Sequence, residues 1–266
     1  MSTDSRDSRA RRADRADRDR AARIRVEPSP KRVRVVLGGH PVADTEHALL
    51  VWEKPNYPTY FLPARDVRTD TFRTTGEHDH SPGLGDAEIH TVVVGEREAP
   101  GAARWYRDSP VAELRDTVRL DWTAMDAWFE EDEEVYVHPR DPFKRVDVLA
   151  SSRHVRVEVG GVTVAESTRS RILYETGLPP RYYFPKTDVR LDLLEPSDHH
   201  TQCPYKGTAS YYTVVVEDDR HENLAWWYQH PALESVRIAG HVAFYNEFVD
   251  LYVDGRLLPR PATPFS

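Results

Sequence analysis

The sequence is poor in cysteine and in long hydrophobic runs. Cys203 is the one cysteine among 266 residues, which excludes an intramolecular disulfide and the multi-cysteine zinc sites of many small β domains. No run approaches the roughly 18 apolar residues of a membrane span, and no apolar segment near the N-terminus resembles a secretory signal. These absences favour a protein of the reducing cytoplasm with no membrane partner.

The signatures of common enzyme classes are also missing. There is no Gly-x-Ser-x-Gly element, no glycine-rich phosphate loop before a helix, and no dinucleotide fingerprint. A serine hydrolase of that type, a P-loop nucleotidase and a dinucleotide-dependent oxidoreductase are therefore not indicated. The sequence predicts no cofactor, and whether the protein is an enzyme stays open.

Charge is unevenly distributed along the chain. Residues 1–32 carry 11 Lys/Arg and 6 Asp/Glu, whereas the remaining residues carry 25 and 38. An acidic body is a poor match for nucleic acid, whose binding requires neutralised phosphates. A nucleic-acid contact is conceivable only through the basic N-terminal arm, residues 1–31. This arm is rich in Arg, Asp and Ala and has almost no apolar surface to bury, so we expect it to be disordered.

The rest of the chain contains its own sequence twice. Adding 122 to a residue number in the first copy gives its counterpart in the second, and 13 of the 35 positions from Val33 to Val67 are identical. The period is too long for a solenoid repeat and indicates a duplicated domain. We expect a first, degenerate copy at 32–147, a second copy at 153–258, and an irregular tail at 259–266.

Both copies have the pattern of β-strands. Alternating apolar and polar residues precede Gly38-Gly39 and Gly160-Gly161, which predicts hairpins at these glycine pairs. The segments 89–94 and 211–216 are strongly strand-like. A last hairpin is expected from 242–245 and 249–253, a helix over 121–129, one or two turns at 231–236, and an inter-domain connection through 143–152. The acidic run 130–134 resembles a solvated helix end. The predicted fold class is mostly β with few short helices.

The copies differ where the second reads Cys203-Pro204-Tyr205-Lys206-Gly207 and the first reads Ser81-Pro82-Gly83-Leu84-Gly85. A turn through Pro204 would bring Lys206 next to Cys203, and an ammonium group can stabilise a thiolate. The alternative is a small buried cysteine that only packs. The joint loss of thiol and amine from the first copy favours a working copy beside a scaffold copy.

Other candidate residues surround this motif. Glu175, which matches Glu53, and His200 are candidate proton carriers, although a structural ion pair explains a glutamate that occurs in both copies better. Aromatic residues are candidates to line a ligand site, or else belong to the core: Tyr182, Tyr183, Tyr205, Tyr211 and Trp227. His199, His200 and Cys203 offer metal-ligand atoms, but adjacent histidines on a strand point to opposite faces, so no metal site is predicted.

The second copy resembles the family known as domain of unknown function 427. The resemblance is carried by the Gly160-Gly161 pair, the 180–183 segment Pro-Arg-Tyr-Tyr, the 203–207 motif and Asp254-Gly255. It covers nearly all of 153–256, and the connection between the copies is similar to that of two-copy, actinobacterial-type members. The resemblance implies a β-tent fold of two antiparallel sheets, as in methionine-R-sulfoxide reductases. The family also carries a nucleotidyltransferase-like label, which implies no mechanism for these residues.

We therefore expect two tandem β-tent-like domains. The expected function is binding or modification of an unknown small molecule in the second domain, near Cys203, Lys206 and Glu175. The alternative is a non-catalytic interaction or scaffold module in which the same residues only pack. Oligomeric state and substrate are not encoded in any recognisable pattern.

Overall fold

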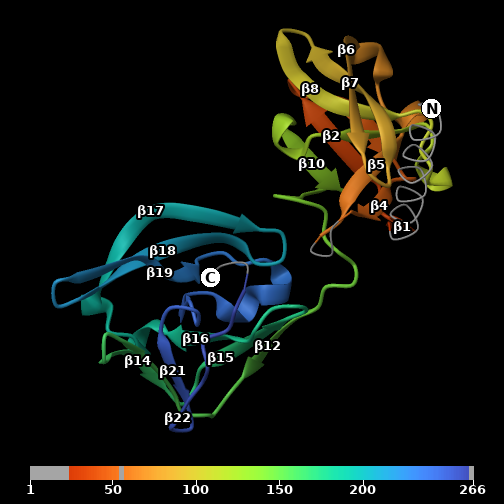
Figure 1. Ribbon diagram of the computed structural model, residues 1–266. Coiled ribbons are helices and arrows are strands. Elements are labelled where there is room, and N and C mark those ends of the chain that lie inside the picture. The colour runs from red at the N-terminus through yellow and green to blue at the C-terminus, as the bar shows by residue number, and fades with distance from the viewer. Residues whose placement is uncertain (1–23, 54–56, 264–266) are drawn as a thin grey trace, which may run out of the picture. The chain divides into compact units, whose positions relative to one another are not determined.

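The computed structural model describes residues 24–53 and 57–263, and the protein is mostly β (Figure 1). Contacts divide the chain into two units, Met1–Asp141 and Pro142–Ser266. Each unit has one seven-stranded and one four-stranded sheet, and the strand pairs within these sheets are antiparallel. The mostly β fold class and the tandem duplication predicted from the sequence are confirmed.

In the first unit the large sheet has, in spatial order, β1 (Arg25–Pro28), β4 (Leu49–Trp52), β5 (Thr59–Pro63), β9 (Thr117–Leu120), β8 (Arg97–Tyr106), β7 (Gly85–Val94) and β6 (Phe72–Ser81). The small sheet has β11 (Glu133–Glu134), β10 (Ala127–Glu130), β2 (Val33–Leu37) and β3 (His40–Thr45). The 3₁₀ turns are η1 (Ala64–Asp66), η2 (Thr69–Thr71), η3 (Ala112–Leu114) and η4 (Trp122–Ala124).

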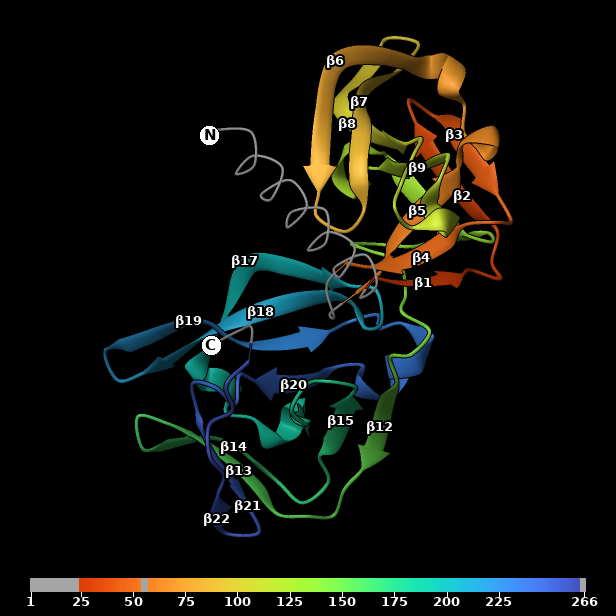
Figure 2. The ribbon, with the colours of Figure 1, turned by 45° about the vertical axis from the view of Figure 1, so that its right-hand side comes forward.

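The second unit has a closely similar strand order. Its large sheet runs β12 (Val146–Ala150), β15 (Arg171–Glu175), β16 (Arg181–Pro185), β20 (His241–Phe244), β19 (Asp219–Tyr228), β18 (Gly207–Val216) and β17 (Leu194–Cys203). Its small sheet has β14 (Val162–Ser167), β13 (Val155–Val159), β21 (Asp250–Val253) and β22 (Arg256–Leu257). The 3₁₀ elements are η5 (Lys186–Asp188), η6 (Leu191–Leu193) and η7 (Leu233–Ile238). In this unit the long strands β17–β19 lie on one side and β13, β14 and β21 on the other (Figure 2).

The glycine pairs form the predicted hairpins. β2 pairs with β3 across Gly38-Gly39, and β13 pairs with β14 across Gly160-Gly161. All four glycines have positive φ, between 57° and 80°, which the two-residue turns of β-hairpins require and which glycine adopts without steric cost. The strands before each pair alternate buried and half-buried residues, as strands with one buried face do.

Each large sheet in the two units carries apolar residues on both faces. In the second unit, one cluster joins Val157 and Val164 of the small sheet to Phe184 and Val214 of the large sheet, so it fills the space between the sheets. In both units we call this side of the large sheet, which faces the small sheet, the inner face. A second cluster contains residues of the large sheet and Ile238 of η7 only, and we call that side the outer face. Alternation along β-strands sends neighbouring residues to opposite faces.

Three predictions about elements were wrong. The helix expected over 121–129 is the single turn η4 followed by strand β10, which pairs with β2. The strands of the expected last hairpin belong to different sheets, because β20 pairs with β16 and β19 while β21 pairs with β13. The expected connection through 143–152 contains β12, which pairs with β15 along its whole length.

Two further corrections concern charged segments. The end of the arm that was expected to be disordered forms β1, which pairs with β4 and packs Val26 against the first unit's core. Residues 1–23 of that arm lie outside the described residues. The acidic run is not a solvated helix end, since it starts in β10 with the buried Glu130, which accepts a hydrogen bond from Tyr60 (2.9 Å). Among the described residues, no helix is long and apolar enough to span a membrane.

Candidate functional site

A tight turn carries the motif that distinguishes the second copy. β17 ends at Cys203 and β18 begins at Gly207, and the backbone N–H of Lys206 donates to the Cys203 carbonyl (3.3 Å). Gly207 has a φ of 93°, and a Cβ there would lie 3.1 Å from the His230 carbonyl oxygen. Only glycine fits such a position without strain. The turn therefore brings the thiol and the amine to the same end of the hairpin, as Pro204 suggested.

Lys206 forms a buried ion pair with Glu175. The lysine Nζ donates to the Glu175 carboxylate, and the two side chains are 14% and 7% exposed. Burial alone would lower the pKa of Lys206, but the neighbouring Cys203 and Glu175 outweigh it, so the pKa is raised. Lys206 therefore stays an ammonium ion at neutral pH. It can supply positive charge to the site, but it is a poor amine nucleophile.

Aromatic side chains form a row across the outer face. Strand register places Tyr211, Trp226, Ala243 and Tyr183 side by side on β18, β19, β20 and β16. The small Ala243 leaves the two rings on either side of it free to meet. The Trp226 indole N–H donates to the Tyr183 hydroxyl (3.1 Å), and the rings pack edge to face. Burial raises the pKa of Tyr183 to about 12.

A second buried ion pair lies on the same face. The Arg181 guanidinium donates two hydrogen bonds to Glu247, both of 2.6 Å, and both side chains are at least nine-tenths buried. The Thr263 hydroxyl also donates to Glu247 (2.5 Å). Arg181 lies 5.7 Å from the Trp226 ring and 5.8 Å from the Tyr245 ring, so it contacts both rings by cation–π interaction. No sequence pattern indicates this pair.

Hydroxyl groups connect the rim of the outer face. Thr201 and the Tyr211 hydroxyl are hydrogen-bonded (2.8 Å), and the Tyr211 and Tyr245 hydroxyls lie 3.4 Å apart. The His199 ring packs against Tyr211, with ring centroids 4.6 Å apart. Thr201 is exposed and Cys203 is partly exposed. Thr201, two positions before Cys203 on β17, thus belongs to a set of hydroxyl groups that reaches the surface.

The structure brings some predicted residues together and separates others. Tyr183 and Tyr211 share the outer face with Cys203, Lys206 and Glu175, and Tyr205 lies in the turn, where its carbonyl accepts from Ser235 (3.1 Å). Tyr182 and Trp227 belong to the inner face. His200 pairs with Ser210, one position away from the Thr201–Ala209 pair, so it too faces away from Cys203. Two pairs of aromatic residues are adjacent in sequence, Tyr182-Tyr183 and Trp226-Trp227. Their second and first members, Tyr183 and Trp226, lie on the outer face.

The first copy fills the equivalent face differently. Leu84 takes the place of Lys206 and is fully buried in an apolar cluster with Phe61, the counterpart of Tyr183. Strand register places Arg104 and Arg119 where the second copy has Trp226 and Ala243. Both arginines are engaged in ion pairs of 2.8 Å, Arg119 with Glu53 and Arg104 with Asp79. The first copy therefore keeps the glutamate and lacks the thiol, the amine, the indole and the hydroxyl found at Tyr183.

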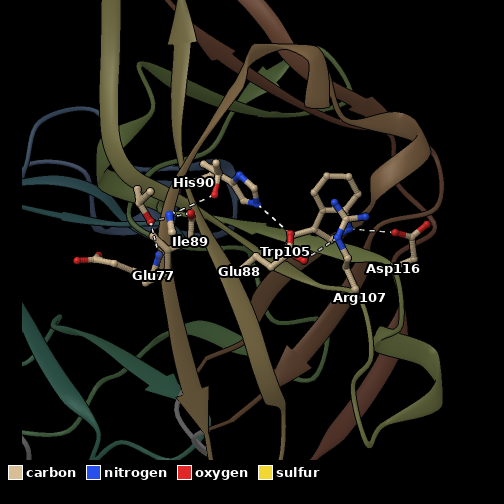
Figure 3. Close-up of polar contacts among 10 residues, drawn as sticks. Glu77, Glu88, Ile89, His90, Trp105, Arg107 and Asp116 are labelled. Carbon is tan, nitrogen blue, oxygen red and sulfur yellow. Dashed lines mark hydrogen bonds and ion pairs between the residues drawn. The ribbon is translucent and has the colours of Figure 1, made fainter.

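The first copy has its own polar cluster at the edge of its inner face (Figure 3). His90 contacts Glu88 (3.3 Å), which accepts from Arg107 (2.9 Å). The Arg107 guanidinium stacks 3.6 Å from the Trp105 ring, whose N–H donates to Asp116 (2.9 Å). In the second copy Lys186 takes the cation's role and lies 3.2 Å from the Trp227 ring. A cation over this tryptophan is thus common to both copies and indicates a role in packing.

Metal-binding groups do not gather in the part of the chain that the structure describes. There, no three or more His, Cys, Asp and Glu side chains lie close enough to hold a metal ion. A shallow polar depression of about 290 Å³ in the first unit is lined by Arg32, Asp44, Thr45, Glu46, His47 and Asp66. Its polar groups bind one another, since Arg32 pairs with Asp44 and Thr45 donates to Asp66, both at 2.7 Å.

These features define a tandem β protein with a polar, aromatic-lined face in its second copy. The chain belongs to the family described as Domain of unknown function (DUF427), whose model matches residues 25–131 and 147–255. The two matches correspond to the two copies and confirm the resemblance drawn from the 203–207 motif. No curated protein matches the chain.

Proposed function

We propose that the second copy binds or modifies a small molecule on its outer face, with Cys203 and Lys206 at the centre and the first copy acting as a scaffold. The observation that carries the proposal is the buried Lys206–Glu175 pair beside Cys203. Removing two charges from water costs more than their attraction commonly returns. The first copy supports the same kind of sheet with leucine in place of lysine, so the fold does not require this amine.

The roles within the site follow from the groups present. Cys203 is the nucleophile or reactive centre, Lys206 stabilises negative charge near it, and Glu175 orients the ammonium. Trp226 and Tyr211 form an apolar wall with hydroxyl groups at its rim. A cytoplasmic location is part of the same proposal, since a lone cysteine stays a thiol in a reducing compartment.

The test replaces each residue by the one that the first copy uses at the same place. Cys203→Ser and Lys206→Leu should each remove the small molecules that co-purify with or bind to the native protein, as measured by mass spectrometry and calorimetry. Ser81→Ala in the first copy is the matched control and should leave binding unchanged. Equal loss from the control, or unchanged binding in both second-copy variants, would favour the alternative of an interaction module in which these residues only pack.

A further inference from the structure

The Tyr183 hydroxyl is buried and accepts a hydrogen bond, but none of the described residues accepts its own proton. Tyr183 is 1% exposed, and its oxygen accepts from the Trp226 indole. Within the described residues this is the only hydrogen bond of that hydroxyl, so its own proton is not used. Buried donors are nearly always satisfied, because an unsatisfied one loses its hydrogen bond to water without replacement. The hydroxyl proton is therefore available to an acceptor from outside the described part of the chain.

The proton stays on this hydroxyl throughout the physiological range. Burial raises the pKa of Tyr183 to about 12, so the phenol is neutral and remains a donor near pH 7. The positive charge of Lys206 and the sulfur of Cys203 both act on the phenol electrostatically, which places the three groups around one region. The Cys203 thiol makes no hydrogen bond within the described residues either.

The donors and charges of this region restrict what it can bind. Tyr183 and Lys206 offer N–H and O–H groups, so the complementary atom is an acceptor that brings no donor of its own, as a carbonyl oxygen does. The charge of Lys206 is already balanced by Glu175. An anionic ligand would add an uncompensated charge to a buried site, which is costly. An uncharged ligand is therefore favoured.

Comparison with the first copy indicates which side-chain groups of the second copy form one site. Phe61 lacks the hydroxyl of Tyr183, and the thiol, amine and indole are absent from the same face of the first copy. A hydroxyl that served packing alone would have no reason to be lost with the thiol and the amine. Their joint absence makes the hydroxyl part of the same site.

We propose that the second copy binds an uncharged carbonyl compound whose oxygen accepts a hydrogen bond from Tyr183 while the neighbouring carbon faces Cys203. This inference rests on the proposed function and names the class of its ligand. Trp226 is then a positioning residue, because its N–H occupies one lone pair of the Tyr183 oxygen and turns the hydroxyl proton toward the ligand.

The single cysteine makes the test direct, because every thiol modification of the full-length protein occurs at Cys203. The probes are iodoacetamide, which carries an uncharged carbonyl beside its reactive carbon, and 2,2′-dithiodipyridine, which has no carbonyl. Tyr183→Phe should slow alkylation by iodoacetamide about three- to tenfold, the worth of one hydrogen bond, and leave the reaction with dithiodipyridine within twofold. Tyr182→Phe is the matched control, since its side chain belongs to the opposite face, and should change neither rate.

A measurement on the native protein avoids dependence on a variant's folding. The ratio of the iodoacetamide rate to the dithiodipyridine rate should be about three- to tenfold higher for Cys203 than for free glutathione. Equal slowing of both reagents by Tyr183→Phe would mean that the residue only packs, and no slowing would mean that water satisfies its proton; either result overturns the inference. If Lys206→Leu abolishes ligand binding while Tyr183→Phe has no effect, the proposed function stands and the carbonyl class is wrong.

Discussion

At the scale of single residues, the two copies keep one glutamate and change its partner. Glu175 pairs with Lys206 from the β17–β18 turn, whereas Glu53 pairs with Arg119 from β9. The Lys206 pair is buried, but the side chains of Glu53 and Arg119 are 26% and 32% exposed. If one member of the pair is removed, water can solvate the remaining charge in the first copy but not in the second. Loss of the ion pair is therefore expected to reduce the free energy of unfolding more in the second copy.

Glu175→Gln should lower the free energy of unfolding of the second unit by about 3–5 kcal/mol, because it leaves the Lys206 ammonium buried without a counter-charge. Glu53→Gln, the matched change, should cost about 1 kcal/mol, as for pairs open to solvent. Chemical denaturation followed by circular dichroism measures both. Combining Glu175→Gln with Lys206→Leu should restore most of the loss, and a double variant as unstable as Glu175→Gln alone would contradict the ion-pair explanation.

The ion pair also has a defined pH range. The pKa of Lys206 is raised above its ordinary value by Cys203 and Glu175, against burial. A raised folded-state pKa stabilises the protein below the unfolded value, and this contribution is lost as the pH rises through the folded value. The second unit should therefore lose stability in the alkaline range, and the Glu175→Gln, Lys206→Leu double variant should lose less over the same range.

At the scale of elements, local sequence patterns correctly predicted the hairpins, which depend only on neighbouring residues. Alternation and the glycine pairs identified β2, β3, β13 and β14 and their hairpins. The segment after Asp121 looked helical because apolar residues recur there at three- and four-residue spacing. Strand pairing of β10 with β2 overrides that propensity and buries Trp128 and Glu130 on alternate positions. The residues 242–253 looked like one hairpin because adjacent strands in sequence commonly pair, whereas the chain here changes sheet.

The candidate site was only partly predictable from the sequence, because part of it also depends on long-range strand pairing. The comparison of the copies identified Cys203, Lys206 and Glu175, which the turn and the ion pair bring together. The comparison could not tell which residue of each adjacent aromatic pair, 182–183 or 226–227, lies on the outer face. Both members of each pair are large, and only the sheet register determines which one faces outward. The partners Arg181 and Glu247 are 66 residues apart, and no sequence spacing links them.

The turn between β17 and β18 gives a prediction at this scale. Gly207→Ala puts a Cβ at a φ of 93° and 3.1 Å from a backbone carbonyl oxygen, so the turn that carries Lys206 must shift. Gly161→Ala is the control, with a φ of 80° and open space around the added carbon. The control should cost about 1–2 kcal/mol from backbone strain alone. Gly207→Ala should cost more and also change the alkylation rate of Cys203, and equal costs with an unchanged rate would show that the turn tolerates a side chain.

At the scale of the whole molecule, each unit has the parts of an independent domain. Contacts separate the chain at Asp141 and Pro142, and the apolar clusters of each unit contain residues of that unit only. Units of this size can bury a core of their own. The duplication also left each copy with a complete pair of sheets. We therefore expect two cooperative unfolding transitions instead of one.

The distribution of Cys and Trp makes this testable in the intact protein. The single thiol, Cys203, lies in the second unit, whereas four of the six tryptophans, Trp52, Trp105, Trp122 and Trp128, lie in the first. Denaturant-dependent labelling of Cys203 reports the second unit, and tryptophan fluorescence is weighted toward the first. Glu175→Gln should move the labelling transition to lower denaturant and leave the main fluorescence transition in place. Because a shared folding unit would lose both together, an equal shift of the two transitions would show that the copies, although duplicated, fold as one.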